Sequence, residues 1–71
     1  MSETPNTLPE FVMLYRRAFA VFRAQALWNL RMIEAPTQED ALVVARALRL
    51  EGDMRARFLA EEIERACLAA V

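Results

Sequence analysis

The chain has 71 residues, of which 56% are hydrophobic and 27% are charged, and its formal net charge at pH 7 is −1. It contains one Cys and no His, and all nine of its basic residues are Arg. These counts exclude an internal disulfide and a Cys/His zinc site, and they leave no imidazole or lysine amine for nucleophilic catalysis. We therefore expect a protein that is not an enzyme and has no catalytic residue, no cofactor and no metal.

Size and hydropathy limit the setting in which such a chain is stable. A chain of about 70 residues buries only about 60% of its unfolded surface, so oligomerisation or very good helix packing remains as the source of extra stability. The longest uncharged stretch after the N-terminal region, Ala24 to Leu30, is far shorter than the ~20 residues that cross a bilayer. The first residues are acidic and polar, unlike a secretory signal, and a single Cys suits a reducing compartment. We expect a cytoplasmic protein.

The N-terminal half predicts a short tail and one long helix. Residues 1–6 are polar and are expected to be disordered, which leaves residues 7–71 as a single small domain. Thr7 and Glu10 have the spacing of a capping box. No Gly or Pro occurs between Pro9 and Glu34. We therefore expect one helix from Leu8 to about Glu34, roughly 26 residues and ~39 Å long.

Two shorter helices are predicted in the second half. Thr37 with Asp40 caps a helix that runs to about Glu51. Gly52, the only glycine, is placed at the left-handed position that ends this helix, and Asp53 caps a third helix that runs to about Ala69. The expected fold is all-α: a long amphipathic helix followed by an antiparallel helical hairpin, completed by dimerisation.

The hairpin helices have clear apolar stripes. In the third helix the stripe is Ala56, Leu59, Ala60, Ile63, Ala66, Cys67 and Ala70, and in the second it is Ala41, Val44, Ala45 and Leu48. A second stripe on the second helix contains Val43, Ala47 and Leu50. Met54 and Phe58 lie opposite the stripe of the third helix, so they are either covered by the first helix or exposed to a partner.

The first helix has more apolar surface than the hairpin can cover. Its apolar arc spans about 200° and holds five of the six aromatic residues. Helices of ~21 and ~25 Å cannot cover a ~39 Å helix along its whole length. Either the first helix breaks near its middle, or its uncovered part contacts another molecule.

We therefore predict an interface on the first helix, formed by Phe19, Phe22, Gln25, Trp28, Asn29 and Leu30. The aromatic residues and Leu30 would supply the apolar contact. Gln25 and Asn29 are four residues apart within the arc, and two interpretations stay open. They either reach solvent or cap a neighbouring helix end, or they pair across a two-fold interface and set its register.

Other features of the sequence have simpler explanations. Cys67 is expected to be a small buried residue, and the acidic residues at 61, 62 and 64 a solvated helix face. These acids and the negative net charge argue against a DNA-binding helix-turn-helix. The hairpin with its Gly52-Asp53-Met54 turn resembles one tetratricopeptide repeat in length, which implies helical-hairpin geometry only.

The sequence thus predicts a small helical protein–protein interaction module that forms a homo-oligomer, most simply a dimer, through its first helix. One alternative is an accessory or inhibitor-like subunit that binds a larger protein through the same surface. Another is peripheral binding to a membrane surface, since the first helix carries four Arg against two Glu.

Overall fold

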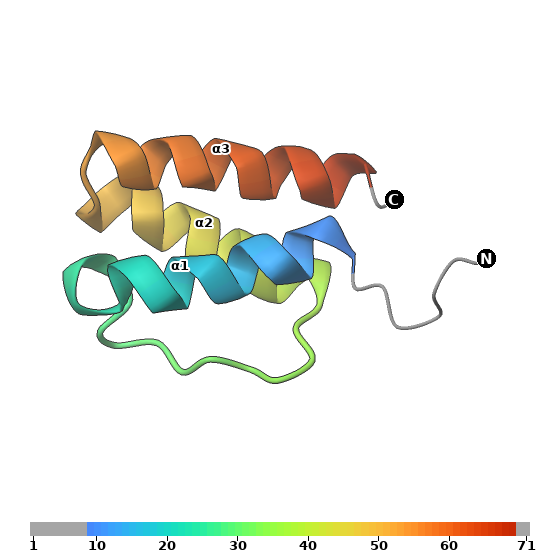
Figure 1. The fold of residues 1–71 in the computed structure, drawn as a ribbon, viewed down its shortest axis with the longest axis horizontal. Helices are drawn as coiled ribbons and strands as arrows, with labels where there is room; N and C mark the ends of the chain where they lie inside the picture. The colour runs from blue at the N-terminus through green and yellow to red at the C-terminus, as the bar shows by residue number, and fades with distance from the viewer. Residues whose placement is uncertain (1–8, 70–71) are drawn as a thin grey trace.

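The computed structural model describes residues 9–69, which form three α-helices packed together (Figure 1). Their bounds are Glu10–Ala26 for α1, Gln38–Glu51 for α2 and Met54–Ala69 for α3. No strand occurs between residues 9 and 69, so the prediction of an all-α, three-helix fold is confirmed. The predicted tail over residues 1–6 and the predicted capping residue Thr7 lie outside the described residues.

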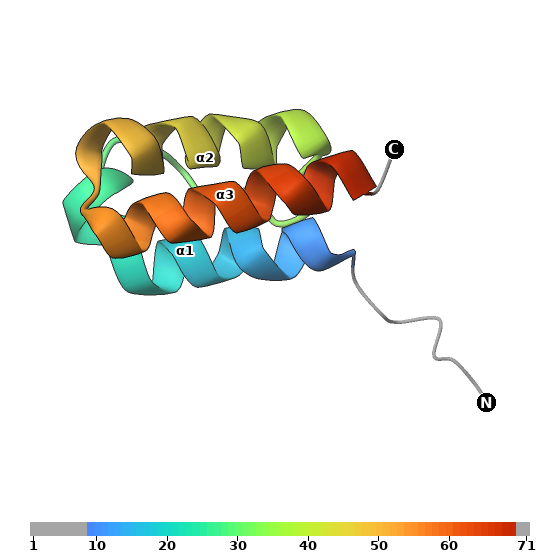
Figure 2. The same cartoon turned by 90° about the horizontal axis from the view of Figure 1, so that it is seen from above.

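The connection between α1 and α2 determines how the helices are directed. Residues 27–37 run back along the bundle, so α2 starts at the same end as α1 and points the same way (Figures 1 and 2). The short turn at residues 52 and 53 then reverses the chain, and α3 runs opposite to both (Figure 2). The second half is therefore an antiparallel hairpin whose two helices both contact α1.

The predicted extent of the first helix is wrong, because α1 ends at Ala26 and not near Glu34. The backbone already leaves helical geometry at Phe22, where φ is −116° and ψ is 17°. The amide of Leu27 then donates to both the Phe22 and the Arg23 carbonyls, at 3.3 and 3.2 Å. Leu27 itself is fully buried, so the end of the helix places this side chain in the core. The first helix therefore breaks, which is one of the two alternatives that its predicted length left open.

Ending α1 early gives three helices of matched length. With 17 residues α1 is about 26 Å long, and with 16 residues α3 is about 24 Å long. Continuing α1 to Glu34 would add about 12 Å of helix with nothing beside it. The same residues instead return along the bundle.

Two hydrogen bonds attach the returning segment to α1. The backbone amide of Ile33 donates to the Tyr15 hydroxyl at 2.8 Å, and Arg16 Nη2 donates to the Glu34 carbonyl at 3.4 Å. Tyr15 is otherwise almost completely buried. A buried hydroxyl needs a partner, and the amide of Ile33 is one.

The predicted caps of α2 and α3 are confirmed. The Thr37 hydroxyl accepts from the Asp40 amide at 3.2 Å, and the Asp40 carboxylate accepts from the Thr37 amide at 2.8 Å. These two bonds form the capping box that starts α2. At the start of α3, Asp53 Oδ1 accepts from the Ala56 amide at 3.0 Å.

The predicted reason for Gly52 is wrong, although its position at the end of α2 is right. Its φ is −95° and its ψ is 173°, which is ordinary extended backbone and not the left-handed region. A Cβ atom at this position would overlap the Cβ of Ala56 and lie only 2.7 Å from the Leu48 carbonyl oxygen. Glycine is therefore required by the close approach of the two helices at the turn.

The core contains the predicted stripes of the hairpin, except for Ala70, which lies outside the described residues. From α3 it buries Ala56, Leu59, Ala60, Ile63, Ala66 and Cys67, and from α2 it buries Ala41, Val44, Ala45 and Leu48. Helix α1 contributes Phe11, Val12, Tyr15, Ala18, Phe19, Phe22 and Ala26. The second apolar stripe of α2 is not part of the core, since Val43 and Leu50 are exposed.

Candidate interaction surface

The six residues predicted to form an interface do not lie on one surface. Phe19 and Phe22 are only 3% and 6% exposed, and both pack into the core of the single chain. Trp28 and Asn29 are exposed, and Leu30 is half-buried. The structure therefore brings the last three together and separates them from the two phenylalanines.

Trp28, Asn29 and Leu30 lie at the turn after α1, beside the outer face of α2. With Val43 and Leu50 they line a shallow hollow of about 210 Å³. Trp28 and Leu50 are 70% and 71% exposed, so this hollow is bordered by large apolar side chains in contact with solvent. We call it the Trp28 hollow.

Gln25 and Asn29 are both exposed, as the simpler of their two interpretations expects. The pKa of Asp53, the cap of α3, is lowered chiefly by the hydrogen bond from the Ala56 amide to its carboxylate, with a smaller contribution from the Gln25 side chain. The pairing of Gln25 and Asn29 across a two-fold interface stays a prediction.

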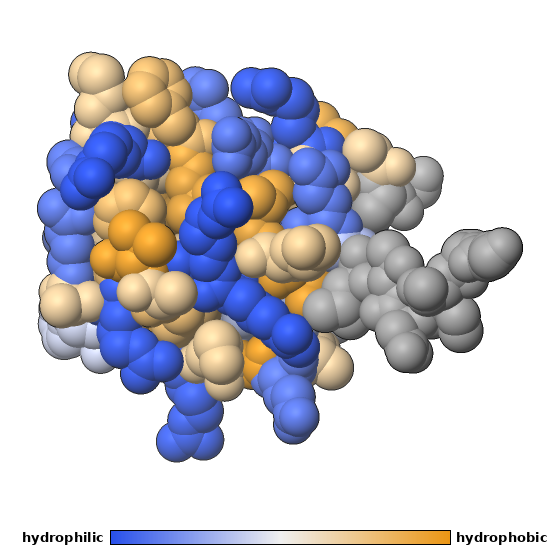
Figure 3. Space-filling model, viewed as in Figure 1, coloured by the Kyte–Doolittle hydropathy of each residue, from blue (hydrophilic) through white to orange (hydrophobic). Residues whose placement is uncertain are grey.

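A longer groove runs between α1 and α3. Its wider part has a volume of about 740 Å³ and includes Glu10, Met13 and Arg17 of α1 opposite Glu62 and Arg65 of α3. Its floor is apolar, because Leu14 and Ala66 also line it. Figure 3 shows this side of the molecule, where apolar surface is visible between hydrophilic side chains.

The same groove continues towards the turn end of the bundle. There a second hollow of about 280 Å³ is lined by Val21 of α1 and by Phe58 and Arg55 of α3. Arg17 and Glu62 line both hollows, so they mark the middle of the groove. We call the two hollows together the α1–α3 groove.

Three large apolar side chains border the α1–α3 groove and are exposed to solvent. Met13 is 59%, Val21 57% and Phe58 60% exposed. Sequence reasoning left Phe58 either covered or exposed, and it did not select Met13 or Val21. The signal for Phe58 was present, since Met54 and Phe58 lie four residues apart opposite the buried stripe of α3.

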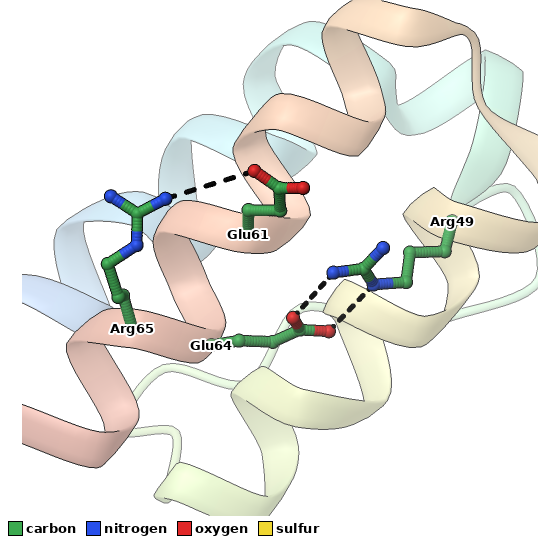
Figure 4. Close-up of polar contacts among 4 residues, drawn as sticks. All are labelled: Arg49, Glu61, Glu64 and Arg65. Carbon is green, nitrogen blue, oxygen red and sulfur yellow. Dashed lines mark hydrogen bonds and ion pairs between the residues drawn. The ribbon is translucent and has the colours of Figure 1, made fainter.

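Ion pairs connect other residues on the surface. Arg49 of α2 and Glu64 of α3 form a bidentate ion pair, with N–O distances of 2.9 and 2.7 Å (Figure 4). This hydrogen bond lowers the pKa of Glu64. The other pairs among residues 9–69 are Arg65–Glu61 and Arg55–Asp53, so neither Arg17 nor Glu62 belongs to an ion pair there.

A fourth hollow lies between α1 and the returning segment. Its volume is about 460 Å³, and Arg16, Arg23, Met32 and Phe19 line it. The guanidinium of Arg23 lies 5.7 Å from the centre of the Phe19 ring, within the range of a cation–π contact. This side of α1 is basic and only partly apolar.

Cys67 is the one thiol in the chain, and the structure places it in the core. Its Sγ lies 3.7 Å from the Gln38 carbonyl oxygen, to which it donates, and burial raises the pKa of the thiol. The part of the chain that the structure describes contains no group of three or more potential ligands that could hold a metal ion.

Comparison of the chain with protein families, with curated proteins and with solved structures finds no match. Among the helices of residues 9–69, none combines the length and the apolar character needed to cross a bilayer.

Proposed function

We propose that this chain is a non-catalytic protein–protein interaction module that binds a second copy of itself through α1. The observation that supports this function is the row of large apolar side chains, Met13, Val21 and Phe58, in solvent along the α1–α3 groove. Exposed apolar side chains that border one groove are typical of interaction surfaces.

The physical reason for association is the small core. A domain of this size has a stability of only about 3–5 kcal/mol from its own core. Each square ångström of apolar surface removed from water contributes about 25 cal/mol, so covering the groove adds stability that the single chain lacks. Binding that involves the folded state alone raises the apparent stability with protein concentration.

The test is the dependence of mass and of melting temperature on protein concentration. In sedimentation equilibrium we expect a weight-average mass that rises above 8.1 kDa as the concentration increases, together with a higher melting temperature. A mass that stays at 8.1 kDa and a constant melting temperature over the same range would contradict self-association.

A second candidate function is that of an accessory subunit, and the Trp28 hollow favours it. This hollow lies beside α2, away from the α1–α3 groove, so a self-associated chain still presents it. Exposed Trp residues are common anchors of protein interfaces. The test is whether Trp28→Ala removes binding to a purified larger protein while leaving the chain's own mass distribution unchanged. Binding that survives this substitution would rule the hollow out.

A third candidate function is binding to a membrane surface. The basic side of α1, which carries Arg16 and Arg23, would then contact the anionic lipids. Co-flotation with anionic vesicles that disappears at high salt is the expected result for that function. An absence of flotation at low salt would eliminate it.

A further inference from the structure

We infer that the second copy binds in the α1–α3 groove about a two-fold axis parallel to the helices, with Arg17 of each copy facing Glu62 of the other. This inference rests on the proposed self-association and adds its geometry. It follows from the order of charged and apolar residues along the two sides of the groove.

The two sides of the groove have complementary residues at its middle and towards the turn. Arg17 and Glu62 line both hollows and so lie at one level, and because α1 and α3 run in opposite directions (Figure 1), four residues forward on α1 are level with four residues back on α3. At the middle, Arg17 of α1 lies across from Glu62 of α3. Towards the turn, Val21 lies across from Phe58.

The open end of the groove is not matched in the same way. Arg65 lies only three residues beyond Glu62, about 4.5 Å along α3, whereas Glu10 lies seven residues before Arg17, about 10 Å along α1. Glu10 is therefore level with Ala69 and not with Arg65. The complementary part of the groove is its middle and its turn end.

One type of two-fold axis in the plane of the interface matches both pairs. An axis parallel to the helices places α1 of one copy on α3 of the other and keeps every residue at its own height. Arg17 then faces Glu62 and Val21 faces Phe58, each from the other copy. The opposite charges at the middle and the apolar groups at the turn end are matched together.

The perpendicular axis in the same plane matches less of the groove. It would place α1 on α1 and α3 on α3, and at the centre of the groove it would bring Arg17 onto Arg17 and Glu62 onto Glu62. Like charges brought together at an interface oppose binding strongly. Moved halfway towards Glu10, the same axis would pair Glu10 with Arg17 but would leave Val21 and Phe58 beyond the end of the facing helices. The parallel axis alone matches the central charges and covers both of these apolar side chains.

The size of the surface sets the expected strength of binding. Two helices about 25 Å long and together about 20 Å wide offer roughly 500 Å² on each copy. Stable interfaces bury about 800 Å² on each partner, so a Kd in the micromolar range is expected. A micromolar dimer with an exposed central charge pair should weaken as salt is added.

The test uses charge reversals that are unfavourable alone and compatible together. Arg17→Glu and Glu62→Arg should each weaken self-association by about tenfold or more, because each places like charges across the interface. When the two variants are mixed, the introduced glutamate of one faces the introduced arginine of the other, and native Arg17 faces native Glu62. The mixture should therefore form a mixed dimer at close to the wild-type Kd.

The mixing step separates contacts between chains from contacts within a chain. Repulsion inside one chain is not relieved by adding a different chain, so recovery in the mixture can come only from an interface. Arg31→Glu and Glu34→Arg are the matched controls, since both residues are exposed on the returning segment outside the groove. They should leave the Kd within about twofold of wild type.

The outcomes distinguish this geometry from the proposed function. If the wild type self-associates but neither the reversals nor their mixture change its Kd, the geometry is wrong and the proposed function stands. A mixture no tighter than either variant alone also overturns the geometry. A wild type that stays monomeric at every concentration overturns both. If a reversal abolishes the helical circular dichroism signal, Arg17→Gln and Glu62→Gln replace it, and each should give a few-fold loss together with a weaker salt dependence.

Discussion

Gly52→Ala should destabilise the protein although the backbone at this position suits any residue. Because φ is −95°, alanine introduces no left-handed strain. It would instead place a methyl group in overlap with the Ala56 side chain and 2.7 Å from the Leu48 carbonyl oxygen. Overpacking of this kind costs about 1–3 kcal/mol, and the reduced entropy of the unfolded chain offsets about 0.4–1 kcal/mol of it.

The net loss for Gly52→Ala is therefore about 1–2 kcal/mol, which lowers the melting temperature of a domain this small by roughly 4–8 °C per kcal/mol. Urea unfolding followed by circular dichroism at 222 nm measures it, at a protein concentration low enough to keep the chain monomeric. The matched control is Gly52→Ala combined with Ala56→Gly, where one of the two overlaps is absent. The penalty should be smaller in that background than in the wild type. A Gly52→Ala variant as stable as the wild type would refute the close-approach argument.

Three further predictions concern single side chains. Tyr15→Phe removes the acceptor of the Ile33 amide and should cost about 1 kcal/mol, with faster hydrogen exchange at Ile33; unchanged exchange there would show that the returning segment is held by other contacts. The pKa of Asp53 is lowered by the Ala56 amide, so its stabilising effect is present above the unfolded pKa, near 3.8, and is lost as the pH falls through the lower folded pKa. Asp53→Asn should therefore flatten the acid limb of the stability profile, and a profile identical to the wild type would contradict this. Cys67 is buried and its pKa is raised, so its alkylation by iodoacetamide should be much slower in buffer than in urea; equal rates would place the thiol at the surface.

The hairpin could be predicted because its signals are local. Thr37 and Asp40 cap α2 within four residues of sequence, and Asp53 caps α3 in the same way. The apolar stripes of both helices have the helical period, so their buried faces follow from spacing alone.

The end of α1 could not be predicted because it depends on distant contacts. No Gly or Pro lies near Ala26, and residues 27–34 have no helix-ending signal of their own. The helix ends where Leu27 enters the core. The segment after it is then held by the hydrogen bond from the Ile33 amide to the Tyr15 hydroxyl, eighteen residues earlier in the chain. Tertiary packing here outweighs local helix propensity.

The same limit explains the mixed result for the predicted interface. Phe19 and Phe22 share a wide apolar arc with Val21, and periodicity alone does not say which part of that arc the hairpin covers. The structure buries the two phenylalanines and leaves Val21 exposed. The role of Trp28, Asn29 and Leu30 in binding stays a prediction, with their joint position at the Trp28 hollow in its favour.

The most direct test of self-association through the α1–α3 groove is an isotope-filtered NOE experiment on a mixture of ¹³C-labelled and unlabelled chains. Val21 and Phe58 line the same hollow within one chain, and the filter retains only contacts between different chains. At a concentration where sedimentation shows a dimer, we predict intermolecular NOEs between the Val21 methyl groups and the Phe58 ring. Intermolecular NOEs that come from Trp28 instead, with none from Val21 or Phe58, would contradict the account.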